Sequence, residues 1–331
     1  MHAMRTKTVT HVFAVLAVGI ATTMCFDMLK QGQQVIAAPF ESDSSLEGQL
    51  HCRAQRVMEM NALRKLRERA NWFEAEISHE REYFRTAKLD SYTAGFLFAP
   101  YYTCPYTLEK SPSVREHFDG GKWMCGLQEL RDGANISCKI FSFGSNYETS
   151  FEDGIDIKRC DVHIFDPTMA SVKAGHSRSK LDEFKSNLPT NYHFHELGIG
   201  SPGQGHVHLD GEKFDAISLV DALKEYGGSY GVDFLKFDVE GFEFDVLEHA
   251  EWEGISVGVL LFEMHGHLIE RVQSVPYTLM KFHEHLSRLE QAGFRIYSME
   301  PVCSGCRAQF EVAAVHKDWH PIHKFANPCR Q

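Results

Sequence analysis

From Lys139 onward, short apolar runs alternate with helical stretches, and this pattern constrains the fold more than any other feature of the 331-residue chain. Strands that alternate with helices form parallel sheets through right-handed crossovers. The last two runs are separated only by a short loop containing Gly and Cys, which predicts a hairpin and one antiparallel strand. The runs are 139–143, 162–165, 192–197, 234–237, 257–262, 294–298 and 310–315. The helical stretches between them include 181–187, 218–226, 243–250 and 277–292.

The overall composition excludes two classes of protein. Hydrophobic residues make up 43% of the chain and charged residues 24%, values typical of a folded globular protein and not of a disordered one. Lys and Arg total 34 against 45 Asp and Glu, which gives a net charge of -11. We expect no nucleic-acid partner, because binding to phosphates requires a basic surface.

Residues 8–26 form an apolar run without Asp, Glu, Lys or Arg. Nineteen residues in a helix span roughly 28 Å, about one hydrocarbon core. Arg5 and Lys7 before the run favour a cytosolic N-terminus. We predict that 1–26 is a signal anchor or a cleaved signal peptide. The protein would then be a single-pass type II membrane protein of the ER or Golgi lumen, contacting the membrane only through this anchor, or secreted if the segment is cleaved.

The cysteines agree with a secretory compartment. Eight follow Cys25, which lies inside the apolar run, and an even number downstream of a secretory signal predicts disulfides. Cys138 and Cys160 precede the first two predicted strands. The starts of adjacent parallel strands lie within disulfide reach, so we predict that these two residues pair. Two further expected pairs are Cys104–Cys125 and Cys303–Cys306.

The chain between the apolar run and the predicted sheet divides into two parts. Residues 27–90 are expected to form a stem, because within 52–90 apolar residues recur at helical spacing among many Arg and Glu. We interpret this part as a solvated amphipathic helix that spaces the domain from the membrane. The main domain is expected over 91–331, with a lead-in at 91–138 that contains the N-glycosylation sequon at Asn135.

Parallel α/β sheets bind ligands beyond the carboxyl ends of their strands, near the reversal of strand order. A small residue after the first strand lets a ligand approach the backbone closely, although a Gly there often marks only a turn. Asp166, after the second strand, is placed to accept hydrogen bonds from both hydroxyls of a ribose, or it caps the next helix. Glycines after the third strand leave room for a flat adenine. The residues expected to border a nucleoside cofactor are Phe143, Gly144, Ser145, Asn146, Asp166, Glu196 and Gly198.

Acidic side chains crowd the ends of the fourth and fifth runs. Asp238, Glu240 and Glu243 lie within six residues, more than a helix N-terminus needs. Glu263 and His265 alternate onto one face of the fifth strand. Such groups suit a general base or ligands of a divalent cation. We predict catalytic roles for Asp238, Glu240, Glu263 and His265, and we consider Asp238, Glu263 and His265 as metal ligands.

Residues 235–243, Leu-Lys-Phe-Asp-Val-Glu-Gly-Phe-Glu, resemble the K-I-D-V-E-G-x-E stretch of FkbM-type methyltransferases. Residues 218–223 look like that family's T-L-D-x-L lead-in, and 260–265 look like its E-x-H. The family's first motif, D-x-G-A-N-x-G, is matched only in part, because Ser142 stands at its opening acid and Glu148 at its last Gly.

Residues 119–125 and the N-terminal segment also look like animal membrane-anchored methyltransferase-like proteins. The resemblance covers about residues 115–316. It implies that 91–331 is a methyltransferase-like domain with the Rossmann-like class I methyltransferase sheet, that S-adenosylmethionine is the methyl donor, and that the reaction is O-methylation. The acceptor stays open as a small molecule, a glycan or a protein.

Two other functions compete with this interpretation. A non-catalytic lumenal binding domain that keeps the fold is favoured by the incomplete first motif. A lumenal glycosyltransferase would suit an anchor and stem, but the nearest approach to its Asp-x-Asp motif is Asp153-Gly-Ile-Asp156, with different spacing. A NAD-dependent enzyme is not indicated, because the G-x-G-x-x-G fingerprint is missing.

Overall fold

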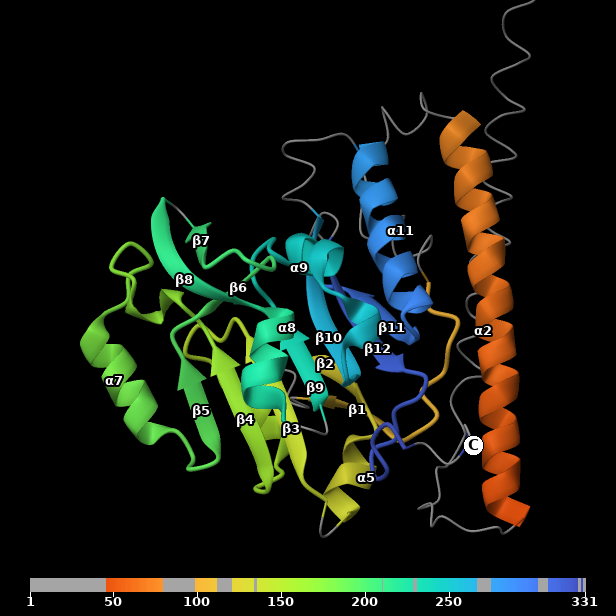
Figure 1. Ribbon diagram of the computed structural model, residues 1–331, viewed down its shortest axis with the longest axis horizontal. Coiled ribbons are helices and arrows are strands. Elements are labelled where there is room, and N and C mark those ends of the chain that lie inside the picture. Colours follow the sequence, from red (N-terminus) through yellow and green to blue (C-terminus); the bar gives the residue numbers. More distant parts are fainter. Residues whose placement is uncertain are drawn as a thin grey trace, which may run out of the picture. The chain divides into compact units, whose positions relative to one another are not determined.

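The central element of the computed structural model is a seven-stranded sheet with the order β11-β12-β10-β9-β3-β4-β5 (Figure 1). Strand β12 runs antiparallel to both neighbours, and every other pair in this sheet is parallel. The predicted Rossmann-like, mostly parallel sheet with an antiparallel terminal hairpin is thereby confirmed. Its strands are β3 Cys138–Phe143, β4 Cys160–Phe165, β5 Tyr192–His195, β9 Val232–Phe237, β10 Val257–His265, β11 Phe294–Pro301 and β12 Gln309–His316.

The structure describes residues 46–79, 99–111, 121–133, 136–209, 211–228, 231–266, 275–302, 309–326 and 329. Its α-helices are α2 Leu46–His79, α5 Leu127–Asp132, α6 Ser150–Ile155, α7 Arg178–Asn187, α8 Leu219–Ala222, α9 Glu243–His249 and α11 Val275–Gln291. Shorter helical turns are η1 Thr168–Ala170, the π-helical η2 Leu223–Gly227 and η3 Trp252–Gly254.

Two small sheets accompany the central one. Strands β1 Leu108–Ser111 and β2 Lys122–Cys125 pair within the expected lead-in. Strands β6 Gly198–Gly200, β7 His206–Leu209 and β8 Glu212–Ser218 form a three-stranded sheet. The predicted run 192–197 is two residues longer than β5, which ends at His195, and β6 begins after the run, at Gly198, in a different sheet.

Alternation along the central strands divides the core between the two faces of the sheet. Phe141 and Phe143 of β3 pack with α8, α9 and α11 on one face, and α8 and α9 lie in front of the sheet in Figure 1. Ile140 of β3 and Phe234 of β9 pack on the other face with β2, α5 and α6. Because both faces are covered, the strands are almost wholly apolar, as the sequence pattern indicated.

Disulfides join the starts of the first two sheet strands and two further parts of the domain. Cys138 and Cys160 are direct neighbours in the β3–β4 register, with 4.5 Å between their Cα atoms, which confirms the predicted bond. The expected Cys104–Cys125 bond is also present. A third bond, Cys52–Cys329, was not predicted and links residues 277 positions apart in the chain.

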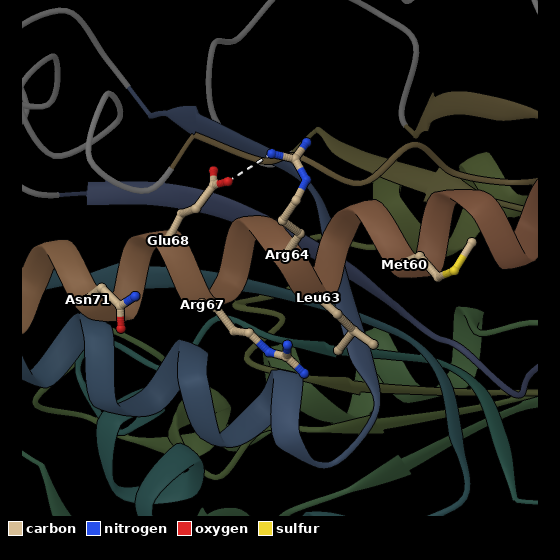
Figure 2. A pocket seen from close by; sticks show the side chains of 6 residues that line it. All are labelled: Met60, Leu63, Arg64, Arg67, Glu68 and Asn71. Carbon is tan, nitrogen blue, oxygen red and sulfur yellow. Dashed lines mark hydrogen bonds and ion pairs between the residues drawn. The ribbon is translucent and has the colours of Figure 1, made fainter.

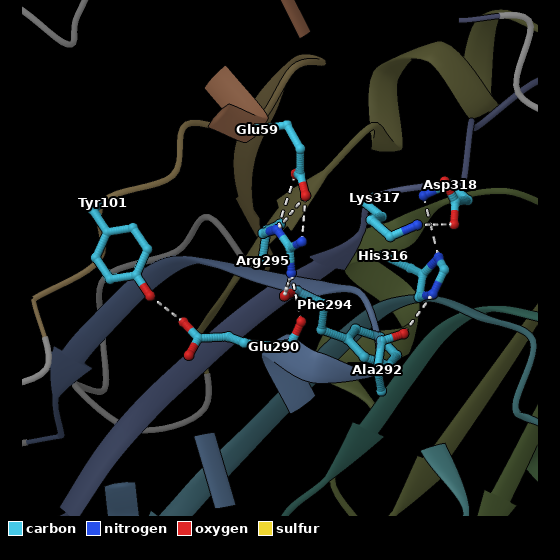
Figure 3. Close-up of polar contacts among 9 residues, drawn as sticks. All are labelled: Glu59, Tyr101, Glu290, Ala292, Phe294, Arg295, His316, Lys317 and Asp318. Carbon is cyan, nitrogen blue, oxygen red and sulfur yellow. Dashed lines mark hydrogen bonds and ion pairs between the residues drawn. The ribbon is translucent and has the colours of Figure 1, made fainter. Parts of the chain in front are cut away.

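Helix α2 is bound to the domain and is not a solvated spacer, which corrects our interpretation of the described part of 52–90. Arg295 of β11 donates from Nε to both carboxylate oxygens of Glu59, at 3.0 and 2.9 Å (Figure 3). Its Nη1 donates to the backbone oxygens of Glu290 and Phe294. A second ion pair joins Arg69 to Glu290, and the bond between Cys52 and the C-terminal segment lies near the start of the same helix.

Several predictions fall outside the described residues: the apolar run 8–26, the sequon at Asn135, and the Cys303–Cys306 pair. They stay predictions. Among the residues that the structure does describe, no helix has the length and apolar character needed to cross a membrane.

A buried histidine in α11 predicts acid sensitivity. His285 is 1% exposed, and neither ring nitrogen has a hydrogen-bond partner among the described residues. Burial lowers the pKa of His285 to about 4, with Glu248 opposing and Lys281 and Arg288 adding to the shift. Because the unfolded imidazole titrates near 6.5, the stability that this group contributes is complete above that pH and is lost as the pH falls towards 4.

We expect this group to cost about 2 kcal/mol of unfolding free energy at pH 5 relative to pH 8. In His285→Leu, the unfolding free energy measured by urea denaturation should fall less between pH 8 and pH 5 than it does in wild type, by about 2 kcal/mol. His208→Gln is the control, because His208 is exposed. Equal losses in wild type and His285→Leu would contradict the prediction.

Candidate functional site

The carboxyl ends of β9 and β10 bring three predicted residues together. Asp238 follows β9, and Glu263 and His265 end β10, its parallel neighbour. One possible ligand atom of each side chain lies within 4.8 Å of those of the other two. Glu263 and His265 are buried, and the Asp238 side chain is 23% exposed. The cluster is therefore reachable through Asp238.

His265 is oriented by a hydrogen bond to Glu243, a residue that our predicted site did not include. Its Nδ1 donates to Oε1 of Glu243 at 2.9 Å. Glu243 is buried, and its carboxylate also accepts the backbone N–H groups of Val239 and Gly241, both at 2.8 Å. This arrangement fixes the ring, and it leaves Nε2 facing Oε1 of Glu263 at 3.4 Å. The sequence signal for Glu243 was present in the dense acids of 238–243.

Glu240 lies at the rim of the cluster. Its side chain is 71% exposed, and its Oε2 is 3.6 Å from Nε2 of His265. Its backbone adopts φ 53°, the left-handed region that non-glycine residues rarely occupy. The turn between β9 and α9 therefore presents Glu240 outward while Glu243 points into the protein.

A buried lysine completes the cluster, and the sequence carried no signal for it. Lys122 of β2 forms an ion pair with Glu311 of β12, and its Nζ lies 3.8 Å from Oδ2 of Asp238. Glu311 stands directly opposite Glu263 in the β10–β12 register. Two carboxylates in these positions repel each other. The ammonium of Lys122 neutralises one of them, that of Glu311.

Burial and the charges of neighbouring groups raise the pKa values of Glu263 and His265 and lower that of Asp238. Burial, Asp238 and Glu311 raise the pKa of Glu263 to about 8. Burial acts to lower the pKa of His265, but Glu243, Glu263 and Asp238 raise it to about 9. Burial opposes ionisation of Asp238, yet Lys122, Lys236 and His265 hold its pKa below the usual value. In the absence of another cation, protons on Glu263 and His265 offset the negative charge of the cluster.

The predicted cofactor loop begins at the neighbouring strand tip and touches the acidic cluster. Gly144 has φ 79°, and a Cβ placed there would lie 1.8 Å from the backbone oxygen of Asp238. The backbone N–H of Asp238 donates to the carbonyl of Phe143 at 3.0 Å. Lys236 donates from Nζ to the carbonyl of Gly144 at 2.7 Å. Only glycine fits this close approach of two strand ends.

Asp166 braces that loop. Its Oδ2 accepts the backbone N–H groups of Ser145 at 3.0 Å and Asn146 at 2.8 Å. Its Oδ1 accepts the backbone N–H and the hydroxyl of Thr168 at 2.8 and 2.7 Å. These four bonds match the acceptor capacity of a carboxylate, and Asp166 is only 3% exposed. The contact with Thr168 at the start of η1 agrees with the alternative prediction that Asp166 caps the next helix, whereas its bonds to the loop were not predicted. A ribose would have to displace one of these four donors.

The remaining predicted cofactor residues lie after β5. Glu196 forms ion pairs with Arg178, at 2.6 Å, and Lys185, at 3.2 Å. Gly198 is buried, and a Cβ there would meet Val207 at 2.9 Å. Close packing of β6 on β7 therefore accounts for this glycine without a ligand.

A hollow elsewhere on the protein contains none of the predicted site residues. Figure 2 shows the side chains that line this hollow, all of them on α2. It is lined by Met60, Leu63, Arg64, Arg67, Glu68 and Asn71. Since these residues carry no nucleophile or convergent acid group, we assign the candidate active site to the strand tips.

Part of the chain is similar to known proteins. Part of the chain is similar to probable methyltransferase-like protein 24 of Homo sapiens, with 29% identity over 168 residues, 49% of this chain and 43% of that protein. The rat protein of the same name is 27% identical over 165 residues, 48% of this chain and 42% of that protein. The matched part thus spans less than half of each relative. Among solved structures, a fibrillarin pre-rRNA processing protein of Methanococcus jannaschii shows 12% identity and a TM-score of 0.35, over 63% of this chain and 88% of that one.

A family model described as a methyltransferase domain matches residues 57–314. The match begins within α2 and ends within β12. It therefore covers most of the helix that ion pairs join to the sheet, six complete central strands and most of the seventh. This chain belongs to that methyltransferase domain family.

Proposed function

We propose that this protein transfers a methyl group from S-adenosylmethionine to a hydroxyl oxygen of a small-molecule, glycan or protein acceptor. The observation that carries the proposal is the meeting of two groups at one sheet edge. The glycine loop after β3 touches Asp238, and Asp238 belongs to the cluster that β10 completes with Glu263 and His265. The edge lies where strand order reverses between β3 and β9, the usual ligand position in such sheets.

The cofactor would lie along the carboxyl ends of β3, β4 and β5. Backbone of 143–146 would border its methionine part, Asp166 its ribose, and Glu196 with Gly198 its adenine. When bound, S-adenosylmethionine supplies an electrophilic methyl group on a positively charged sulfur. The Asp166 carboxylate holds the loop in shape, and the ribose would have to displace one of its four donors.

Methyl transfer requires alignment and the removal of one proton. The acceptor oxygen forms a bond to the methyl carbon, the S–CH₃ bond breaks, and its electron pair stays on sulfur. The hydroxyl proton passes to the carboxylate of Asp238, which is the most accessible of the three clustered side chains. Glu240, Glu263 and His265 would hold the acceptor above Asp238.

The first test is binding of S-adenosylmethionine by calorimetry with wild type and Asp166→Asn. We expect at least a tenfold loss in the variant, corresponding to about 1.4 kcal/mol. The amide presents N–H atoms where the carboxylate now accepts two backbone N–H groups, so the loop must move. Thr168→Val is the control, because it removes only the hydroxyl donor to Asp166 and should bind at least as well as wild type.

Undiminished binding by Asp166→Asn would contradict the cofactor position. No binding by disulfide-bonded wild type would favour the other candidate function, a non-catalytic domain that keeps the fold. The fully occupied carboxylate of Asp166 is the observation that favours this alternative.

We further propose that the protein acts in the secretory lumen, as a type II membrane protein or in secreted form. The three disulfides support this placement, since such bonds persist mainly in oxidising compartments. Protection from protease in intact microsomes and loss of mass on glycosidase treatment would support it. Digestion of the domain in intact microsomes would contradict it.

A further inference from the structure

The strand-tip cluster has the geometry of a cation site and not only that of an acid–base pair. Glu263 and His265 are two residues apart on β10 and face the same side, next to Asp238. Nε2 of His265 and Oε1 of Glu263 are 3.4 Å apart. Two neighbouring ligands of a divalent ion are about 3 Å apart when each bond is about 2.1 Å long. A carboxylate oxygen of Asp238 lies within 4.8 Å of both. Small side-chain rotations would therefore bring the three ligand atoms to the distances that one ion requires.

Glu263 provides a second, independent observation. Glu263 is 4% exposed, and the ion-pair partner of its carboxylate among the described residues is Nε2 of His265 at 3.4 Å. The residue directly opposite in β12 is another acid, Glu311. The nearby ammonium of Lys122 is paired with Glu311. Two buried acids therefore share one lysine and one imidazole ring, and a divalent ion would supply the further positive charge that they require.

The support of His265 is the third observation. Metal-binding histidines commonly donate their other ring N–H to a carboxylate, which fixes the tautomer and the ring orientation. Nδ1 of His265 makes this contact with Glu243, and two backbone N–H groups hold Glu243 in place. With Nδ1–H donated to Glu243, a bound ion would replace the proton on Nε2, the ring nitrogen that faces Glu263.

We propose that Asp238, Glu263 and His265 bind one divalent metal ion through two carboxylates and one imidazole. Such a mixed set suits Mn²⁺, Fe²⁺ or Zn²⁺ better than Ca²⁺, which prefers oxygen alone. The role of the ion rests on the proposed function: it would bind the acceptor hydroxyl and lower its pKa, and solvent would then take the proton in place of Asp238, which serves as a ligand. Binding of the ion itself does not depend on that function.

The experiment is electron paramagnetic resonance of Mn²⁺ added to the disulfide-bonded full chain, with pulsed detection of nitrogen coupling. We expect one bound ion per chain and a coupling from one imidazole nitrogen. The coupling should disappear in His265→Gln, and binding should weaken by more than about 10-fold in Glu263→Gln and Asp238→Asn. Asp245→Asn is the matched control, since Asp245 is a partly exposed carboxylate of the adjacent α9 that takes no part in the set.

Wild type alone also tests the proposal, should a variant fail to fold. Addition of Mn²⁺ must raise its thermal midpoint, because an ion that binds only the folded state stabilises it. Absence of both Mn²⁺ and Zn²⁺ binding up to about 1 mM, the weak end of protein sites, would overturn the proposal. Equal affinity in wild type and all three ligand variants would also overturn it.

Calorimetry with S-adenosylmethionine separates the two proposals. Metal binding without cofactor binding would uphold the cation site and contradict methyl transfer. Cofactor binding by a chain that takes up no metal would overturn the cation site and leave the methyltransferase proposal standing.

Discussion

Gly144→Ala is expected to abolish S-adenosylmethionine binding and to lower the free energy of unfolding by about 2–5 kcal/mol. The left-handed backbone of residue 144 costs a residue with a Cβ about 1–2 kcal/mol. Overpacking adds about 1–3 kcal/mol, because the new methyl group would lie 1.8 Å from the backbone oxygen of Asp238. Relief of this clash requires β3 and β9 to separate at the point where the cofactor loop begins. Urea unfolding and calorimetry measure the two effects.

Gly175→Ala is the matched control for this prediction. Gly175 has φ 78°, nearly that of Gly144, but a Cβ there would meet nothing within 4 Å. The control should therefore show only the conformational cost and normal cofactor binding. If both variants lose the same stability and bind cofactor equally, the close approach of Gly144 to Asp238 is not essential to the site.

Glu59→Gln is expected to destabilise the protein by about 3–5 kcal/mol, because it leaves a buried guanidinium without its counter-ion. Figure 3 shows Glu59 accepting from Arg295, whose remaining N–H groups point to backbone oxygens. The Arg295 side chain is 3% exposed and that of Glu59 is 11% exposed, so water replaces little of the lost contact. The midpoint of urea unfolding measures the effect.

An exposed ion pair on the same helix provides the comparison. Glu68 accepts from Arg64 at 2.8 Å with both side chains more than half exposed, and such pairs contribute at most about 0.5 kcal/mol. Glu68→Gln should therefore be almost neutral. A loss in Glu59→Gln no greater than that in Glu68→Gln would show that α2 is not held by this contact. The double variant Glu59→Leu, Arg295→Met should recover most of the loss, since removal of both charges leaves neither unpaired.

The local sequence pattern was sufficient to predict the sheet and part of the candidate site. A strand buried on both faces is apolar throughout, so the β3, β9 and β10 segments were visible as short runs between helical stretches. Residues that directly follow such runs must lie at one edge of a parallel sheet, which is why Asp238, Glu263 and Gly144 were placed together correctly. The Cys138–Cys160 pair followed from the same geometry, because both cysteines begin adjacent strands. The roles of these site residues stay predictions until cofactor and metal binding are measured.

The sequence determined the alternation of elements, the strand tips at which acids and glycines gather, and one disulfide, because each depends on residues close in the chain or on neighbouring strands. Tertiary structure alone decided which distant groups complete the site. Lys122 and Glu311 come from β2 and β12, 189 residues apart, and no local pattern marks their pairing. The same holds for Glu59 with Arg295 and for Cys52 with Cys329, which make α2 part of the domain. The physical reason is that a buried charge needs a partner of opposite sign but does not specify where in the chain that partner lies.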